Sequence, residues 1–336
     1  GHLTSWLRNL PNLVSHANNT YWKTVASLLC EGQNVFLAMV AEHTRHSPGT
    51  MGAKLLVAKN RDPVGTIGGG IMEYTLLKRA KDILENGSYT PEIQTLSHRK
   101  SGPEEKSGMI CAGKQTNLYY LCCPEKDGKT VERIVHLLHH NQSALLSIDP
   151  SGMAVQKQKS DIHELQIKLS QDNNNWLYEE QLQNFKRIAI IGGGHCSLAL
   201  SRVMKHLGYD VFVFDTRTNV STVGENKYAH TVQIVDDYQD VAALIQYPEL
   251  TQVVVMATDV ASDIRGLLGV IHQPFPFIGV MGSQAKIAEI TRRLKSDGVT
   301  EDQLSRLTAP VGIPMVSNTP EEIAISVAAQ LLQKRD

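Results

Sequence analysis

Three consecutive glycines at 192–194 follow a short apolar run at residues 187–191 and lead into His195, where a segment of helical character begins. A buried strand that passes through glycines into a helix is typical of dinucleotide-binding loops. The first glycine allows the chain to reverse sharply, the second lets the backbone approach a pyrophosphate, and the helix N-terminus offers free N–H groups to the anion. Asp215 ends a second apolar run 23 residues after the first glycine, about where a ribose-binding carboxylate is expected.

The composition is that of an ordinary folded protein of about two domains, with 336 residues, 42% hydrophobic and 20% charged. The formal net charge of −1 offers no general attraction to nucleic acid. No run approaches the roughly 18 apolar residues of a membrane helix, and no secretory signal pattern opens the chain. The five cysteines are an odd number without a C-x-x-C pair, which favours free thiols in a reducing compartment. We therefore expect a cytoplasmic protein that binds neither nucleic acid nor a membrane.

From residue 186 onward, short apolar runs alternate with segments of helical character. The runs lie at 187–191, 211–215, 231–235, 251–256 and 275–280. This alternation predicts a doubly wound parallel sheet, a Rossmann-type α/β fold, over residues 186–336. Near the end, the stretch Thr319-Pro320-Glu321-Glu322 has an N-cap residue, a proline for the first helical position and a glutamate that completes a capping box. A last helix is therefore predicted to begin at Pro320.

Residues 1–150 show a mixed pattern that predicts an N-terminal α+β accessory domain. A helix is expected near 21–30, and strands are expected near 34–42, 54–59, 64–67, 116–123 and 142–148. A second glycine cluster, at 68–70, leads into a long helix with an apolar stripe, and Gly87 is expected to end that helix. Residues 151–185 are polar and weakly periodic, so they are expected to form a connector between the two domains.

Several motifs, taken together, carry a resemblance to a known family. In chain order they are Ser47-Pro48-Gly49 with Gly52-Ala53; Gly65-Thr66-Ile67-Gly68-Gly69-Gly70 with Glu73; Met109-Ile110-Cys111 with Gly113; Gly192-Gly193-Gly194-His195; Asp215 with Arg217; Gly279-Val280-Met281-Gly282-Ser283 with Lys286; Ala309-Pro310-Val311-Gly312; and Thr319-Pro320-Glu321-Glu322. On these motifs, which span almost the whole chain, the sequence is similar to the xanthine dehydrogenase accessory (XdhC/CoxI) family. It departs from the family pattern at Ala112, where members commonly have glycine.

The resemblance implies a maturation factor rather than an enzyme. Members of this family assist insertion of the molybdenum cofactor, molybdopterin, into molybdenum hydroxylases. The expected partner is therefore an apo-molybdenum hydroxylase of the xanthine dehydrogenase type, and the role requires no turnover. The residues expected to contact the cofactor are Gly68, Gly69, Gly70, Glu73, Cys111, Gly113, Gly192, Gly194, His195 and Asp215. A carrier that encloses a labile ligand between surfaces also favours a homodimer.

Other interpretations are open for several of these residues. The glycines at 68–70 form either an anion or pterin cradle or simply a tight turn with positive φ. Glu73 would compete with a phosphate at the start of the helix, so it is expected to bond pterin nitrogens or neighbouring backbone. Cys111 is either a soft ligand for molybdenum or its sulfur, or an inert half-buried thiol. His195 either contacts a ligand or is a solvent-facing cap.

The main alternative function is an NAD(P)-dependent oxidoreductase. It would use Gly192, Gly194 and Asp215 for the dinucleotide, with substrate contacts from the N-terminal domain. Asp215 would then select an unphosphorylated ribose, because a carboxylate repels a 2′-phosphate. Against this alternative, no proton donor is evident beside the expected nicotinamide position. A third alternative is a nucleotide-sensing scaffold. No catalytic residue is assigned, and no metal site is expected, since the histidines show no ligand spacing with cysteines or carboxylates.

Overall fold

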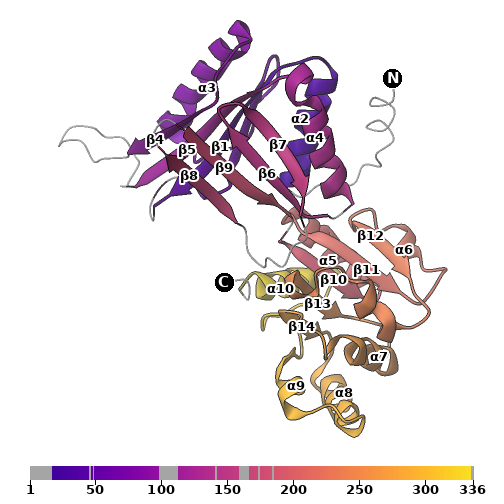
Figure 1. Ribbon diagram of the computed structural model, residues 1–336. Coiled ribbons are helices and arrows are strands. Elements are labelled where there is room, and N and C mark those ends of the chain that lie inside the picture. The colour runs from indigo at the N-terminus through magenta and orange to yellow at the C-terminus, as the bar shows by residue number, and fades with distance from the viewer. Residues whose placement is uncertain are drawn as a thin grey trace. The chain divides into compact units, whose positions relative to one another are not determined.

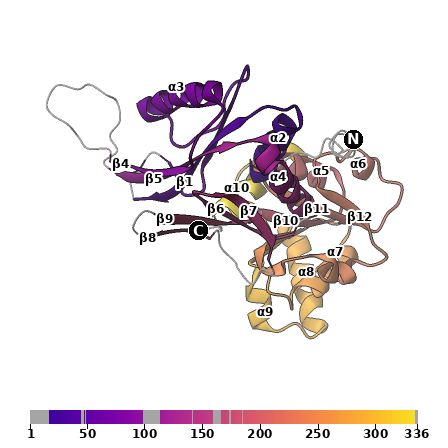
Figure 2. The ribbon, with the colours of Figure 1, turned by 45° about the horizontal axis from the view of Figure 1, so that its top comes forward.

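The computed structural model describes residues 17–44, 47, 49–97, 113–140, 142–158, 166–172, 175–183 and 185–333. The described residues divide into two compact units, which we call the N-terminal unit, within Ala17–Gln183, and the C-terminal unit, within Asn184–Asp336. Figures 1 and 2 label most of the helices and strands of both units. No helix in the described part of the chain is long and apolar enough to cross a membrane.

The C-terminal unit is built on a six-stranded parallel sheet. Its strands are β10 (Arg187–Ile191), β11 (Asp210–Asp215), β12 (Thr231–Ile234), β13 (Thr251–Val255), β14 (Phe277–Val280) and β15 (Leu307–Thr308). They lie in the order β12-β11-β10-β13-β14-β15, which is the doubly wound arrangement of Rossmann folds, with the reversal of strand order between β10 and β13. The predicted fold class is confirmed. The five expected strands are present with ends shifted by at most two residues, and β15 is an additional short edge strand.

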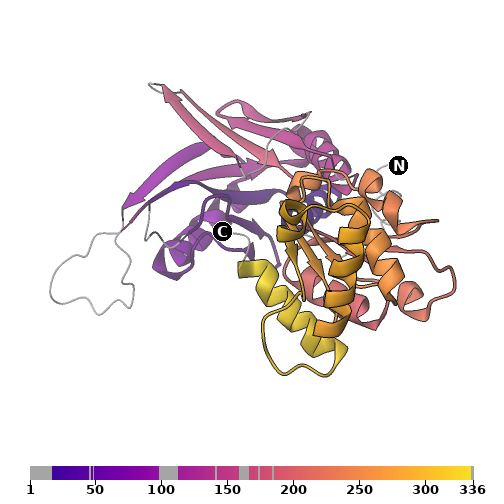
Figure 3. The same ribbon diagram turned by 90° about the horizontal axis from the view of Figure 1, so that it is seen from below.

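Helices cover both faces of this sheet. On one face, α5 (His195–His206) and α10 (Pro320–Gln333) share an apolar cluster with the strands; on the other lie α7 (Val260–Val270), α8 (Gln284–Ser296) and the 3₁₀ helix η1 (Tyr238–Leu244). The helix α10, yellow in Figure 3, begins at Pro320 as predicted. Its capping box is formed, because Glu322 accepts from the backbone N–H of Thr319 and the Thr319 hydroxyl accepts from the N–H of Glu322.

The N-terminal unit contains two antiparallel sheets. The five-stranded sheet has the order β3-β2-β1-β5-β4 and the four-stranded sheet the order β7-β6-β9-β8. Their strands are β1 (Val35–His43), β2 (Lys54–Ala58), β3 (Val64–Gly65), β4 (Glu92–Ser97), β5 (Lys114–Cys122), β6 (Ala144–Asp149), β7 (Gly152–Lys157), β8 (Ile167–Asp172) and β9 (Asn175–Leu182). The helices of this unit are α2 (Ala17–Cys30), α3 (Gly70–Asn86) and α4 (Pro124–His139).

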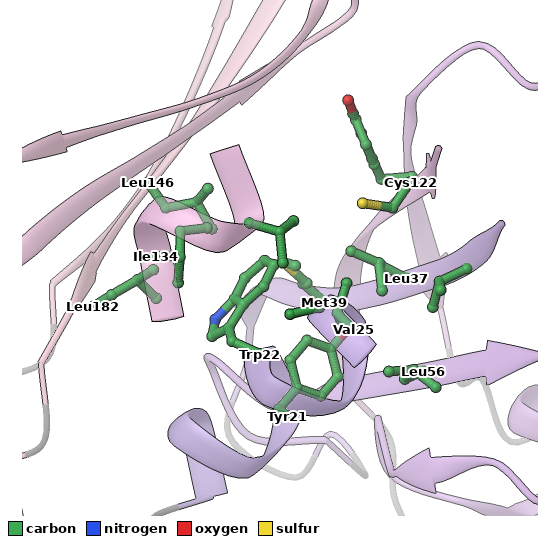
Figure 4. Packing of buried hydrophobic residues seen from close by; sticks show 14 of the residues in the cluster. Tyr21, Trp22, Val25, Leu37, Met39, Leu56, Cys122, Ile134, Leu146 and Leu182 are labelled. Atoms are coloured by element: carbon green, nitrogen blue, oxygen red, sulfur yellow. The ribbon is translucent and has the colours of Figure 1, made fainter. Parts of the chain in front are cut away.

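The main core of the N-terminal unit lies between its two sheets. Trp22 of α2 is fully buried there and packs among side chains from both sheets and from α4, including Met39, Ile134 and Leu146 (Figure 4). The helix α3 covers the other face of the five-stranded sheet with its predicted apolar stripe, and Gly87 ends it in the left-handed conformation. Apolar side chains on both faces of the central strands explain why these strands were recognisable in the sequence.

The connector expected over 151–185 is wrong, because these residues form β7, β8 and β9 of the four-stranded sheet. Most residues of β7 and β8 are half-buried or exposed. An edge strand with one face toward solvent keeps many polar residues, so its hydrophobic pattern is weak. The change between the two compact units falls at residues 183 and 184.

A buried ion pair joins the two sheets of the N-terminal unit. The Nζ of Lys54 on β2 lies 2.5 Å from Oε1 of Glu180 on β9, and both side chains are almost completely inaccessible. Lys54 also donates to the carbonyl of Gly52, and the Tyr178 hydroxyl donates to the second oxygen of Glu180. Each charge therefore has a charged partner and a further hydrogen bond, which a buried ion pair needs to be tolerated.

Candidate functional site

The glycine turn of the N-terminal unit is closed by its own helix. Gly65, Gly68, Gly69 and Gly70 all have positive φ, so the chain between β3 and α3 follows a path that glycine adopts most readily. The carboxylate of Glu73, in the first turn of α3, reaches back to this path. Its Oε2 accepts from the Thr66 hydroxyl at 2.6 Å and from the backbone N–H groups of Ile67 at 3.0 Å and Gly69 at 3.1 Å.

The expected backbone bonding of Glu73 is thus observed, and it changes what the turn can bind. One carboxylate oxygen already accepts from the backbone N–H groups of the turn that precedes α3, and its negative charge disfavours an external anion beside it. The other oxygen, Oε1, makes no hydrogen bond with any described residue. The N–H groups of Ile67 and Gly69 are therefore not free for a phosphate, and the turn presents a carboxylate oxygen that can accept from a ligand N–H.

Replacing Glu73 by glutamine is expected to lower the free energy of unfolding of the N-terminal unit by about 1–2 kcal/mol, since charge-assisted hydrogen bonds to two backbone donors are weakened. Denaturant unfolding monitored by tryptophan fluorescence would measure this. Glu85→Gln, an exposed carboxylate later in α3, is the matched control and should be nearly neutral. Equal stability of the Glu73 and Glu85 variants would show that the bonds at the turn contribute little.

A buried glutamine connects two motifs that lie far apart in the sequence. Gln115 accepts from the N–H of Gly49 at 2.9 Å, and its amide donates to the carbonyl of Ile67 and the side chain of Asn117, both at 2.8 Å. A Cβ at position 49 would lie 2.4 Å from the Ile67 oxygen, so the two loops approach as closely as their backbones allow. The sequence alone did not point to Gln115, because the strand was expected to begin only at residue 116. The available signal was the spacing of Gln115 and Asn117, which puts both on one face of β5.

Gly113 is buried directly before β5, and the next residue, Lys114, donates its N–H to the Thr44 hydroxyl at 2.8 Å. Cys111 and the polar loop before it lie outside the described residues. Among the described cysteines, Cys122 is buried while Cys123 and Cys196 are half-buried. Burial raises the pKa of all three thiols, which therefore lack the thiolate character of a reactive cysteine. No cluster of three or more histidine, cysteine or carboxylate side chains in the described ranges is arranged to hold a metal ion.

In the C-terminal unit, Gly192 is required by backbone packing. Its φ is 108°, and a Cβ there would lie 2.5 Å from the carbonyl oxygen of Met256, just beyond the end of β13. Its N–H donates to the carbonyl of Phe214 on β11 at 2.8 Å. The first glycine therefore lets the turn after β10 pass close to the neighbouring strand at the point where the strand order reverses.

The acceptor positions of Asp215 are filled by the protein itself. The side chain is completely buried; Oδ2 accepts from the N–H of Gly193 at 2.7 Å and from Nη2 of Arg217 at 2.7 Å, while Oδ1 accepts from the N–H and Nε of Arg217 at 2.8 and 2.9 Å. A carboxylate offers about four such positions. Burial acts to raise the pKa of Asp215, but the bonds from Arg217 and Gly193 outweigh it and hold the pKa below its usual value. No acceptor is left for a ribose hydroxyl.

The same turn is packed against the short helix α6 (Ser221–Gly224). The Thr222 hydroxyl donates to the carbonyl of Gly193, and a Cβ on that glycine would lie 2.5 Å from a methyl group of Val223. In Rossmann folds the ribose lies beside the end of the second strand and the glycine turn. Here Asp215, with its partner Arg217, and the helix α6 pack directly against Gly193 of this turn.

The start of α5 is open by contrast. Its N-cap is Gly194, which provides no side-chain cap; a Cβ on this glycine would meet nothing within 4 Å, and His195 is exposed. The helices α7 and α8 are capped by the side chains of Asp259 and Ser283. The first turn of α5 therefore keeps its N–H groups and positive dipole end available to an external acceptor.

A lysine is held at the same edge of the sheet, beyond β13 and β14. The Nζ of Lys286 lies 2.5 Å from Oδ2 of the fully buried Asp263, whose other oxygen accepts from the N–H of Ala257 at 2.9 Å. Burial raises the pKa of Asp263, although the Lys286 ammonium acts in the opposite direction. A Cβ at Gly282 would lie 2.9 Å from Cδ of Lys286, so this glycine leaves room for the lysine side chain to reach Asp263.

The fold and these sites define a two-unit protein with a Rossmann-type C-terminal half whose ribose-side carboxylate is satisfied internally. Residues 188–331 match the family model of the XdhC Rossmann domain, and residues 28–96 match that of the XdhC and CoxI family. The chain belongs to the XdhC and CoxI family.

The chain is similar to known proteins in sequence and in fold. It is 32% identical over 151 residues to an uncharacterized Escherichia coli protein, YqeB; the match covers 45% of this chain and only 27% of that protein's length. The fold is similar to a Bacillus halodurans protein described as a xanthine dehydrogenase, with a TM-score of 0.71, 20% identity, and coverage of 94% of this chain and 95% of that one. At this identity the structural likeness supports the fold alone.

Proposed function

We propose that this protein is a maturation factor that binds the molybdenum cofactor, molybdopterin, and delivers it to an apo-hydroxylase of the xanthine dehydrogenase type. Membership of the XdhC and CoxI family supports the maturation role. The observation that carries the proposal further is the state of the Rossmann turn. Asp215 is saturated by the chain itself, while the first turn of α5 is uncapped and open. This combination suits an anionic ligand that is not held as a dinucleotide.

The residues present fit the chemical groups of a phosphorylated pterin. The open turn at Gly194 and His195 would receive the phosphate, since free N–H groups and a helix dipole favour an anion. In the N-terminal unit, taken by itself, Oε1 of Glu73 could accept from an N–H group of a pterin, while Gly68, Gly69 and Gly70 shape the turn that holds this carboxylate. When bound, the cofactor supplies the molybdenum centre that the client hydroxylase uses.

The alternative, an NAD(P)-dependent oxidoreductase, is less well supported by the site. Ribose recognition at Asp215 would require Arg217 to release at least one of the two carboxylate oxygens that it contacts through Nε and Nη2. Incubation with NAD(H) and NADP(H), followed by thermal unfolding, separates the two ideas. We expect no nucleotide-dependent rise in Tm, whereas a ligand that binds only the folded state would raise it by mass action. A rise with either nucleotide would favour the oxidoreductase.

Cys111 remains our proposed contact to the molybdenum or its exchangeable sulfur. Cys111→Ser keeps the side chain nearly the same size but replaces a soft sulfur with a hard hydroxyl. We expect unchanged stability and a fall of about tenfold or more in retained molybdenum, in line with the affinity lost when a metal contact is perturbed. Metal analysis of the purified variants measures this, with Cys30→Ser, an exposed cysteine at the end of α2, as control. Equal molybdenum content in the two variants would leave Cys111 as an inert thiol.

The proposed homodimer is tested on the same preparations. Sedimentation of the purified chain with and without cofactor would show whether a second copy helps to enclose the ligand. A monomer in both states would remove the dimer from the proposal without affecting cofactor binding.

A further inference from the structure

A groove of about 800 Å³ lies along α5 within the C-terminal unit. The first turns of α10 and the side chain of Tyr228 form its sides. Its apolar lining comes from Leu198, Ala199 and Val203 on α5 and from Ile325 on α10, which is 52% exposed. An exposed apolar strip between two helices is a surface that an amphipathic helix can cover.

Positively charged side chains lie in and beside the groove. Arg202 and Lys205 line it, and Lys227 lies beside it, because the Nζ atoms of both lysines are within 6.0 Å of the centre of the Tyr228 ring. Glu321 is the one carboxylate among the lining residues. The open positive end of α5 lies at the His195 end of the same groove.

These cations differ from most of the other lysine and arginine side chains described in the C-terminal unit. Six lysine and arginine side chains with exposed or partly exposed heads each have a carboxylate within ion-pair distance: Arg217, Arg265, Lys286, Arg292, Arg293 and Lys295. Arg202, Lys205 and Lys227 have no carboxylate partner among the described residues. Burial and the nearby Lys227 lower the pKa of Lys205, as expected where like charges gather. Carboxylates brought by a partner would offset this repulsion.

We propose that this groove docks an acidic, amphipathic helical segment of the client apo-hydroxylase. The inference rests on the proposed function for the identity of the client. The 12 residues of α5 span about 18 Å, enough for about three turns of a partner helix. Its apolar side chains would cover the strip from Leu198 to Ile325, and its carboxylates would pair with Arg202 and Lys227, which are both exposed. Opposite charges at the rim set the orientation and speed the encounter.

The experiment measures binding of the purified apo-hydroxylase to the full chain at several salt concentrations. The test variant carries Arg202→Glu and Lys227→Glu. The control carries Arg292→Glu and Lys295→Glu on α8, which packs on the opposite face of the sheet. Both variants replace two basic residues by glutamate, so they change the net charge of the chain by the same amount. We expect the test variant to bind about tenfold more weakly or worse at low salt and to lose most of the salt dependence. The control should bind like the wild type, and both variants should retain the same cofactor content.

The outcomes separate docking from cofactor binding. Unchanged hydroxylase affinity in the test variant overturns the docking proposal, as does a wild type that holds cofactor but does not bind the hydroxylase. If the test variant changes the oligomeric state without weakening hydroxylase binding, the docking proposal is overturned, and the groove is instead an interface with a second copy of this chain. A wild type that binds the hydroxylase through this groove but never holds cofactor contradicts the proposed function while supporting the docking site.

Discussion

Asp215→Asn is expected to lower the free energy of unfolding of the C-terminal unit by about 2–4 kcal/mol, because a buried charged partner of Arg217 and Gly193 is lost. The substitution keeps the size of the side chain. It places an amide NH₂ donor against the N–H groups of Gly193 and Arg217, which in the wild type donate to a carboxylate oxygen. Hydrogen exchange of amides in β10 and β11 would measure the change locally. Asp236→Asn, an exposed carboxylate after β12, is the matched control and should shift stability by less than about 0.5 kcal/mol.

The difference in stability between the wild type and Asp215→Asn should depend on pH, because the pKa of Asp215 is lowered in the folded protein. A carboxylate whose pKa is lower in the folded state contributes stability above its unfolded value of about 3.9, and the contribution is lost as the pH falls through the folded value. Wild type and Asp215→Asn should therefore converge in stability toward strongly acidic pH. A variant that is as stable as the wild type at neutral pH, yet loses binding of NAD(H), would instead assign Asp215 to a nucleotide.

Lys54→Met is expected to lower the free energy of unfolding of the N-terminal unit by about 3–5 kcal/mol, since it leaves the fully buried Glu180 without its cation. All three tryptophans precede residue 184, and Trp22 is fully buried in the core between the two sheets. Denaturant unfolding followed by tryptophan fluorescence therefore reports on this unit. Lys59→Met, at an exposed position just after β2, should be nearly neutral.

A second substitution distinguishes an unpaired charge from a general packing defect. The double variant Lys54→Met with Glu180→Leu removes both charges, so it should recover much of the lost stability. A double variant as unstable as Lys54→Met would mean that the ion pair is not the origin of the loss.

The parts of the fold that could be predicted have strong local signals. The strands β10 and β13 are buried along their whole length, and most of their residues are apolar, without the alternation of a half-exposed strand. The start of α10 was predictable because its N-cap, proline and glutamate lie within four consecutive residues. The strands β7 and β8 have no comparable signal, since none of their residues is fully buried. They are defined by pairing with β6 and β9.

At the candidate sites, the residue types could be predicted but their partners could not. Glu73 was expected to bond either pterin nitrogens or neighbouring backbone, and its bonds to the backbone of Ile67 and Gly69 are local. Asp215 was interpreted as a ribose ligand because its spacing from Gly192 is right. Its saturation depends on the rotamer of Arg217 and on the approach of Gly193, which spacing does not specify. Gln115 was missed for a similar reason, because its two loops meet only in three dimensions.

The most direct test of the proposed function is the molybdenum and pterin content of the protein purified from a host that makes the cofactor. We predict that molybdenum and pterin are present in comparable amounts, close to stoichiometric with the chain, and that both are absent when the host cannot make the cofactor. Protein from the competent host that carries neither molybdenum nor pterin would contradict the proposal that this chain is a cofactor carrier.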